Sequence, residues 1–350
     1  MLEEIRQQPE ALDRTLRTAV SFAGRLRKQL AKRRPRLIIL AARGTSDNAA
    51  QFGRYLLEIT TGIPVSMAAP SIVTVYQASV DYREVLVVAV SQSGESTDTN
   101  LVLERARENG ACTLGITNEA SSTLARLAEH VWLVRAGREK SVAATKTYTG
   151  QLLMFYLLAH TLGATIHLDD LRRLPGWTDV ALGVASEVRE RVERFRFMTD
   201  TTVISRGLNY ANALEFALKL KETCYVVAEG FSSADFLHGP IAMVQESFPA
   251  FLFAPGGVTW PAVREMLEKL QQRKAETVII TDAGNREARA GSGRVISVPL
   301  KLSRKSTWPE DLYTAIPYIV PAQLFAAMLA EQKGLDPDRP RTLTKVTRTL

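Results

Sequence analysis

The stretch VLVVAVSQSGES, residues 85–96, says most about how this chain folds. Its first half, VLVVAV, is a continuous apolar run rich in valine, which is typical of a strand buried on both faces of a parallel sheet. Its second half, SQSGES, is a short polar turn, and the spacing of apolar residues after it predicts a helix from about Thr97 to Asn109. Strand, loop and helix in this order predict a parallel α/β sheet.

The same pattern recurs on both sides of this stretch. LIILAA (37–42) predicts an earlier buried strand, and the loop RGTSDN and a helix through Leu57 follow it. A long helix is predicted from about Ala144 to Leu162, and a last one over 318–333. Further strands are predicted at 112–118, 130–134, 201–207, 248–253, 277–282 and 295–300. The chain is therefore expected to contain a duplicated α/β unit.

These elements divide the chain into five segments, and the boundary between the two α/β regions is marked by Pro175 and Gly176 followed by a charged amphipathic helix. The polar tail after the last helix contains several prolines and aspartates, which favour turns. The predicted segments are an N-terminal helical segment (1–35), a first α/β domain (36–165), a connecting helix (166–197), a second α/β domain (198–334) and a C-terminal tail (335–350).

Composition places the chain among ordinary globular proteins. It has 350 residues, 46% of them hydrophobic and 23% charged, which is enough for two domains. The first twenty residues lack the apolar core of a signal peptide. The longest apolar stretch, 152–162, contains His160 and is too short to cross a bilayer. We therefore expect a soluble, cytoplasmic protein with no membrane partner, whose two cysteines are free thiols.

The formal net charge of +7 raises the question of nucleic acid or another anion as partner. The densest basic run, 25–36, has no interleaved aromatic residues and no base-reading motif nearby, so we interpret it as a solvated helix face and expect no nucleic-acid partner. The four histidines show no metal-ligand spacing, and the glycine motifs of nucleotide and nicotinamide sites are missing. No metal or other cofactor is expected.

The turn SQSGES carries the first functional signal. Its hydroxyl and amide groups, together with the free N–H groups of the following helix, favour a bound anion. Gly94 allows the backbone to approach a ligand closely. Ligands of open α/β sheets bind beyond the carboxyl ends of strands, and the turn Gly44-Thr45-Ser46 follows the preceding strand in the same way. The two turns predict a phosphate site, with a simple serine helix cap as the alternative.

Six motifs carry a resemblance to a known family. Their residues are RGTSDN (43–48), SQSGESTDT (91–99), EKSVAATKTYT (139–149), ALEFALKLKE (213–222), FLHGP (236–240) and DPDRPRTLTKVT (336–347). In this order they resemble the sugar isomerase (SIS) domain family, and in particular the isomerase half of glutamine–fructose-6-phosphate aminotransferases. The resemblance covers nearly the whole chain. It implies two SIS domains, each a parallel sheet flanked by helices in three αβα layers.

The resemblance also implies an activity. The aminotransferases carry a glutaminase domain with an N-terminal cysteine, whereas residue 2 here is Leu2, so we expect no glutamine hydrolysis from this chain. Its end, KVTRTL, is similar to stand-alone glucosamine-6-phosphate deaminases, which implies release of ammonia from glucosamine 6-phosphate to give fructose 6-phosphate. The alternatives are a deglycase of Amadori sugar 6-phosphates, a galactosamine-6-phosphate deaminase/isomerase, and a non-enzymatic sensor of sugar phosphates.

Residue roles follow from the same resemblance. The residues that it implies around the phosphate are Ser46, Ser91, Gln92, Ser93 and Ser96, with Thr45 and Val142 lining the site. From the residues alone, Glu222 is interpreted as a solvated charge on a helix, with Lys219 and Lys221 as its salt-bridge neighbours. The resemblance makes Glu222 the base that moves a proton between C1 and C2 of the sugar, with Lys219 in the same catalytic group.

Two more residues complete the expected set. His238 precedes Gly-Pro and is interpreted from the residues alone as a turn histidine; the resemblance implies that it relays the proton of ring opening from the other subunit. That implies a homodimer with a shared active site. Lys345 lies in the polar tail, and from the residues alone it is interpreted as a solvated lysine. The resemblance places it over the sugar, where its amine meets the open-chain carbonyl by a Schiff base or a hydrogen bond.

Overall fold

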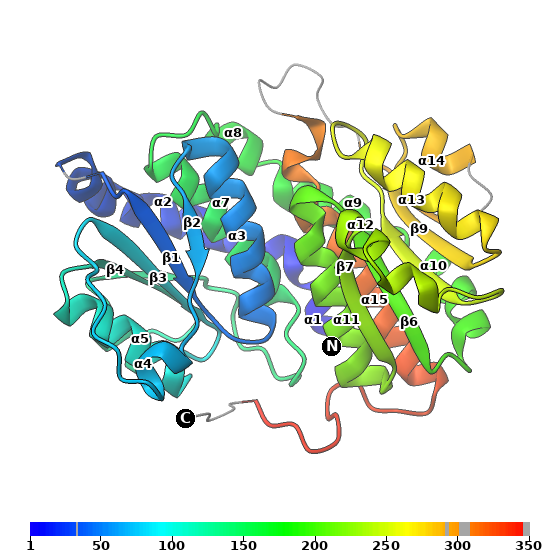
Figure 1. Ribbon diagram of the computed structural model, residues 1–350, viewed down its shortest axis with the longest axis horizontal. Helices are drawn as coiled ribbons and strands as arrows, with labels where there is room; N and C mark the ends of the chain where they lie inside the picture. Colours follow the sequence, from blue (N-terminus) through cyan, green and yellow to red (C-terminus); the bar gives the residue numbers. More distant parts are fainter. Residues whose placement is uncertain (33, 291–293, 301–308, 346–350) are drawn as a thin grey trace. The chain divides into compact units, whose positions relative to one another are not determined.

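The computed structural model describes residues 1–32, 34–290, 294–300 and 309–345 (Figure 1). The end of the predicted tail, 346–350, and parts of the predicted second domain, 291–293 and 301–308, lie outside the described residues. Contacts group the chain into two compact units. The amino-half unit comprises 10–139, 146–173 and, in the tail, 342–345; the carboxyl-half unit comprises 1–9, 140–145 and 174–341.

The amino-half unit is built on a five-stranded parallel sheet with strand order β2-β1-β3-β4-β5. Its central strand β3 is buried at every position, as its apolar run predicts. β2 is not predicted from the sequence, because three residues are too few to show a period. The strands are β1 (Leu37–Ala41), β2 (Val65–Met67), β3 (Val85–Ser91), β4 (Cys112–Thr117) and β5 (His130–Leu133).

Helices cover both faces of this sheet (Figure 1). α3 (Thr45–Thr61) and α7 (Lys146–Thr161) pack against each other on one face, and α7 is buried along almost its whole length. The other face is covered by α5 (Thr97–Glu108) and α6 (Thr123–Leu127), whose Leu103 and Leu124 join the apolar cluster beneath Val87. The remaining helices are α2 (Gln8–Lys32), α4 (Ser71–Thr74) and α8 (Leu168–Leu171).

The carboxyl-half unit repeats this topology in a second five-stranded parallel sheet, with order β10-β9-β8-β6-β7. Numbered along the chain within each unit, both sheets have the order 2-1-3-4-5, which makes the duplication visible in the topology. The strands are β6 (Asp200–Ser205), β7 (Val227–Ser232), β8 (Pro249–Phe253), β9 (Glu276–Asp282) and β10 (Arg294–Val298).

Two helix layers enclose the second sheet as well. On one face, Phe216 of α11 (Tyr210–Cys224) and Phe325 of α15 (Ala315–Gln332) pack edge to face with Phe251 of β8. The other face meets α13 (Trp260–Gln272), α12 (Ser233–Leu237) and α14 (Arg286–Ala290) through one apolar cluster. The unit also contains α1 (Leu2–Arg6), η2 (Gly207–Asn209), η3 (Pro240–Met243) and η4 (Glu310–Tyr313).

The segment 166–197, for which one connecting helix is predicted, contains several short helices instead. They are α8, α9 (Leu174–Leu182), α10 (Ala185–Val192) and η1 (Glu193–Phe195). Pro175 lies in the first turn of α9, where its missing N–H is tolerated, but its ring cannot continue a preceding helix. Gly183 falls in the break between α9 and α10.

The expected fold class is confirmed: this is an α/β protein with two parallel sheets flanked by helices. In the amino-half sheet, β1 and β3 are neighbours, and the chain leaves them toward opposite edges. A crevice opens at the carboxyl ends of such a strand pair, and ligands of open α/β sheets bind there. In the described part of the chain, no helix is long and apolar enough to cross a membrane.

Candidate active-site residues

Both hydroxyl-bearing turns lie at this switch point of the amino-half sheet. Ser46 is in the first turn of α3, which a short loop (42–44) joins to the end of β1, and Ser91 is the last residue of β3. α3 and α5 therefore both begin at the carboxyl ends of the two central strands, with their free N–H groups and positive dipole ends. The site has the position and the donors that an anion requires.

The loop between β3 and α5 is held in place by its own hydrogen bonds. The Ser91 hydroxyl oxygen accepts from the N–H of Gly94 at 3.0 Å. Further along, the Glu95 carboxylate accepts from both the N–H and the hydroxyl of Thr123, each at 2.8 Å. The Gln92 carbonyl accepts from the N–H of Asn118 at 3.1 Å. A loop fixed in this way presents its donors without needing to be ordered by a ligand.

Gly94 is required by this geometry. Its φ is +66°, in the left-handed region, and a Cβ there would overlap the side chain of Ser122, which caps α6. We expect Gly94→Ala to cost about 1–3 kcal/mol in folding free energy and to weaken binding of a phosphate anion about tenfold or more. Urea unfolding and titration calorimetry with inorganic phosphate measure the two effects.

A matched control for that substitution is Gly24→Ala. Gly24 lies in the helix α2 with nothing near its absent Cβ and no positive φ, so alanine is expected to be neutral or to stabilise by up to about 1 kcal/mol. Equal effects of the two alanines on phosphate binding would contradict the role given to Gly94.

The other predicted phosphate residues are only partly available for a ligand. Ser96 donates its hydroxyl proton to Asp98 at 2.9 Å, and Asp98 in turn is paired with Arg43 at 2.5 Å. The Ser93 hydroxyl oxygen accepts from the N–H of Glu95 at 3.3 Å. Thr45 and Gln92 are half-buried in the same two turns. Val142 belongs to the carboxyl-half unit, where its N–H donates to the carbonyl of Asp338 at 3.3 Å.

In the carboxyl-half unit, α11 brings three charged side chains together on one face. Lys219 is fully buried and lies between Glu215, 3.4 Å away and equally buried, and Glu222, to which it donates a hydrogen bond. Burial disfavours the ammonium, but Glu215 and then Glu222 outweigh it and hold the pKa of Lys219 above its ordinary value. Lys219 therefore stays charged at neutral pH beside the predicted base.

Glu222 differs from its neighbours in being accessible. Its side chain is 23% exposed, while those of Lys219 and Glu215 are 0% exposed. The structure thus provides a carboxylate that a ligand can reach, oriented from behind by a buried cation. Glu215 is not among the residues expected from the sequence, although its position four residues before Lys219 is the spacing of a helical ion pair.

The remaining predicted residues also have defined surroundings. His238 is exposed, directly after α12, and its N–H donates to the carbonyl of Asp235 at 3.1 Å. Lys345 places its ammonium 3.5 Å from the buried carboxylate of Glu139. Glu139 also accepts from the N–H and hydroxyl of Thr147, at 3.2 and 2.8 Å, in the first turn of α7. In the described part of the tail, Lys345 is therefore anchored to the amino-half unit.

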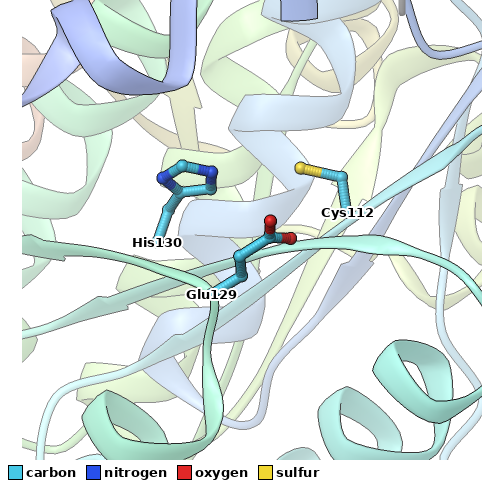
Figure 2. Close-up of side chains that lie close together, drawn as sticks. All are labelled: Cys112, Glu129 and His130. Carbon is cyan, nitrogen blue, oxygen red and sulfur yellow. The ribbon is translucent and has the colours of Figure 1, made fainter. Parts of the chain in front are cut away.

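A cluster of potential metal ligands lies at the amino ends of strands β4 and β5, away from the serine turns. Figure 2 shows the side chains of Cys112, Glu129 and His130 converging, with their ligand atoms within 4.8 Å of one another. Cys112 and His130 are the first residues of β4 and β5, so spacing along the chain does not reveal them. Burial, with a contribution from Glu129, raises the pKa of Cys112 to about 12, and burial lowers the pKa of His130.

One amide accounts for this convergence. Gln29 of α2 donates to Glu129 at 2.8 Å, lies 2.6 Å from His130 Nε2 through its oxygen, and reaches Cys112 Sγ at 3.6 Å. These contacts fasten α2 to the amino ends of β4 and β5. The cluster is thus explained as a hydrogen-bonded attachment and carries no catalytic assignment.

Comparison with known proteins bears on the whole chain. The SIS domain family matches residues 30–161 and 201–329. A glutamine–fructose-6-phosphate aminotransferase [isomerizing] of Pyrococcus horikoshii is 37% identical over 352 aligned positions, which cover 99% of this chain and 57% of that protein. The chain thus spans little more than half the length of such relatives.

Two solved structures match over nearly their full length. The structure of a putative phosphosugar isomerase from Silicibacter pomeroyi superposes with a TM-score of 0.82 at 31% identity, covering 96% of this chain and 98% of that one. A glucosamine-6-phosphate deaminase from Thermotoga maritima superposes with a TM-score of 0.80 at 21% identity, covering 99% of both chains. The second likeness concerns the fold alone.

Proposed function

Because the chain belongs to the SIS domain family, we propose that it is a phosphosugar isomerase, and specifically that it deaminates glucosamine 6-phosphate. The observation that carries the proposal is that the chain has both a pair of serine-bearing turns at the carboxyl ends of two strands and an accessible carboxylate backed by a buried lysine. A protein that only senses sugar phosphates needs the serine-bearing turns but not the carboxylate. The accessible carboxylate can move a proton, which an isomerase or deaminase requires.

The phosphate is the natural anion for the serine turns. Ser46 and the loop 91–96 offer hydroxyl and N–H donors at the start of α3 and α5, and hydrogen bonds to a charged acceptor are about twice as strong as neutral ones. The names of the matched aminotransferase and isomerase both refer to a sugar phosphate, which is fructose 6-phosphate in the first.

Glu222 serves as the base in this proposal. Ring opening, assisted by the imidazole of His238, gives the free aldehyde of glucosamine 6-phosphate. Glu222 removes the proton from C2 and returns it to C1, through an enolamine, which leaves an imine at C2. Water adds to that imine, the C–N bond breaks, and fructose 6-phosphate and ammonia are released. Lys219 keeps Glu222 oriented and supplies the compensating positive charge.

Two finer points belong to the same proposal. Lys345 meets the open-chain carbonyl through a hydrogen bond or, after its ammonium gives a proton to Glu139 3.5 Å away, through a Schiff base that releases water. The partner subunit of a homodimer contributes His238 to the site. Such a residue must be exposed on the single chain in order to reach the other subunit, and His238 is exposed.

A panel of three substrates tests the proposal. Purified protein is incubated with glucosamine 6-phosphate, galactosamine 6-phosphate and a fructosamine 6-phosphate, and ammonia is measured together with the sugar phosphate formed. We expect the largest kcat/KM for glucosamine 6-phosphate, with equal amounts of ammonia and fructose 6-phosphate. A larger kcat/KM for galactosamine 6-phosphate or for the fructosamine 6-phosphate would change the proposed substrate but leave the protein an enzyme that acts on amino sugar phosphates. Binding of all three without turnover would contradict the enzyme and support a sensor.

A further inference from the structure

Gln151 lies where it can control a phosphate-binding hydroxyl. It is in the second turn of α7, its side chain is completely buried, and its amide nitrogen donates to the hydroxyl oxygen of Ser46 at 2.9 Å. Ser46 is in the first turn of α3, which packs along α7. Both residues belong to the amino-half unit. This contact is the only side-chain hydrogen bond of Ser46 among the residues that the structure describes.

This contact limits the direction in which the Ser46 hydroxyl can donate its proton. A hydroxyl has one proton to donate and two lone pairs that accept. The N–H of Gln151 occupies one lone pair, so the proton cannot point along the same line. Within the described part of the chain no acceptor for it is present, while the residue is 6% exposed. The proton is therefore available to a ligand at the switch point of the sheet.

The same contact gives the orientation of the amide. Gln151 Nε2 lies 2.9 Å from the Ser46 hydroxyl oxygen, whereas Gln151 Oε1 is buried and has no hydrogen-bond partner in the described residues. An amide nitrogen can only donate, so Gln151 faces Ser46 as a donor.

We propose that Gln151 is a positioning residue for phosphate recognition, because its amide fixes the Ser46 hydroxyl as a donor toward the phosphate. The inference rests on the proposed function, since it needs a sugar phosphate at the serine turns. A hydroxyl already aimed at its acceptor loses no further rotational freedom on binding. Gln151 does not itself touch the substrate, and it acts through Ser46.

The sharpest test is Gln151→Glu, which keeps the shape and exchanges the donor for an acceptor. The introduced carboxylate draws the Ser46 proton to itself, so we expect the affinity for glucosamine 6-phosphate and for inorganic phosphate to fall about 10- to 100-fold near pH 8. Burial raises the pKa of a carboxyl group, and the protonated form can donate again. Affinity relative to wild type is therefore expected to recover as the pH is lowered, which a merely structural defect would not do.

Two further variants isolate the mechanism. In a Ser46→Ala background, Gln151→Glu is expected to change phosphate affinity by less than about threefold, because the hydroxyl through which it acts is gone. If the single variant does not fold, Gln151→Met removes the donor without adding charge, and a weakening of several fold is expected only when Ser46 is present. Titration calorimetry gives the affinities, and thermal unfolding shows that each variant is folded.

The outcomes separate this inference from the function on which it rests. Wild type that binds and turns over the sugar phosphate, together with unchanged affinity in Gln151→Glu, would overturn the positioning role alone. The same fold-loss with and without the Ser46 hydroxyl would also overturn it, since the effect would then be charge repulsion. Wild type that binds neither ligand would overturn the proposed phosphate site, and the inference with it.

Discussion

Glu222→Gln is expected to lower kcat for ammonia release from glucosamine 6-phosphate by about 10²- to 10⁴-fold, the usual contribution of a general base. The amide has nearly the same shape, and its oxygen can still accept the hydrogen bond of Lys219, but it cannot take a proton from C2. Substrate affinity is expected to stay within a few fold of wild type. Steady-state assays and calorimetry measure the two quantities separately.

Glu268→Gln is a suitable control for this substitution. Glu268 is an exposed residue of α13 in the same unit, and within the described residues its one ion pair is a surface contact with Arg264. It is expected to leave kcat unchanged. If Glu222→Gln retained more than a tenth of wild-type turnover, Glu222 would not be the base, and proton transfer would have to be assigned to another group.

The largest loss of stability is expected for Lys219→Met. The substitution removes a fully buried cation that lies between Glu215 and Glu222 and leaves the buried carboxylate of Glu215 beside an apolar side chain. Removing one partner of a buried ion pair typically costs about 3–5 kcal/mol. Urea unfolding followed by circular dichroism measures the change, which should appear as a lower midpoint.

Lys221→Met provides the comparison, because Lys221 is the next lysine on α11 and is exposed. Its expected effect is within about 0.5 kcal/mol. Adding Glu215→Gln to Lys219→Met should recover part of the lost stability, since an uncharged amide costs less to bury than a carboxylate. A loss below about 1 kcal/mol in Lys219→Met alone would contradict the view that the cation neutralises buried charge.

Elements with a continuous apolar run could be predicted from the sequence, whereas short edge elements could not. The strands beginning at Leu37 and Val85 are buried by layers on both faces, so their composition alone indicates them. β7 has no such run, because its sequence VAEGFS mixes small, charged and aromatic residues, and it lies at the edge of its sheet. For the segment 166–197 the sequence predicts one helix. Pro175 and Gly183 divide it into shorter ones, but the period of apolar residues locates the ends of helices poorly.

The candidate site divides in a similar way. Ser46 and Ser91 belong to polar turns that come after apolar runs, so their place at the carboxyl ends of β1 and β3 could be inferred from local pattern. Gln151 and Glu139 have no such signal, because their partners are distant in sequence and meet them only through tertiary packing. Glu215 had a local signal, the four-residue spacing to Lys219, but nothing in the sequence shows that the pair is buried.

The most direct test of the central claim, proton transfer at C2 of an amino sugar phosphate, is proton NMR of glucosamine 6-phosphate incubated with the protein in D₂O. We expect the H2 signal to disappear as fructose 6-phosphate and an equal amount of ammonia accumulate, and we expect the Glu222→Gln variant to leave H2 unchanged over the same time. An H2 signal that persists with wild type, while calorimetry shows that the sugar phosphate binds, would contradict the deaminase and indicate a sugar-phosphate sensor.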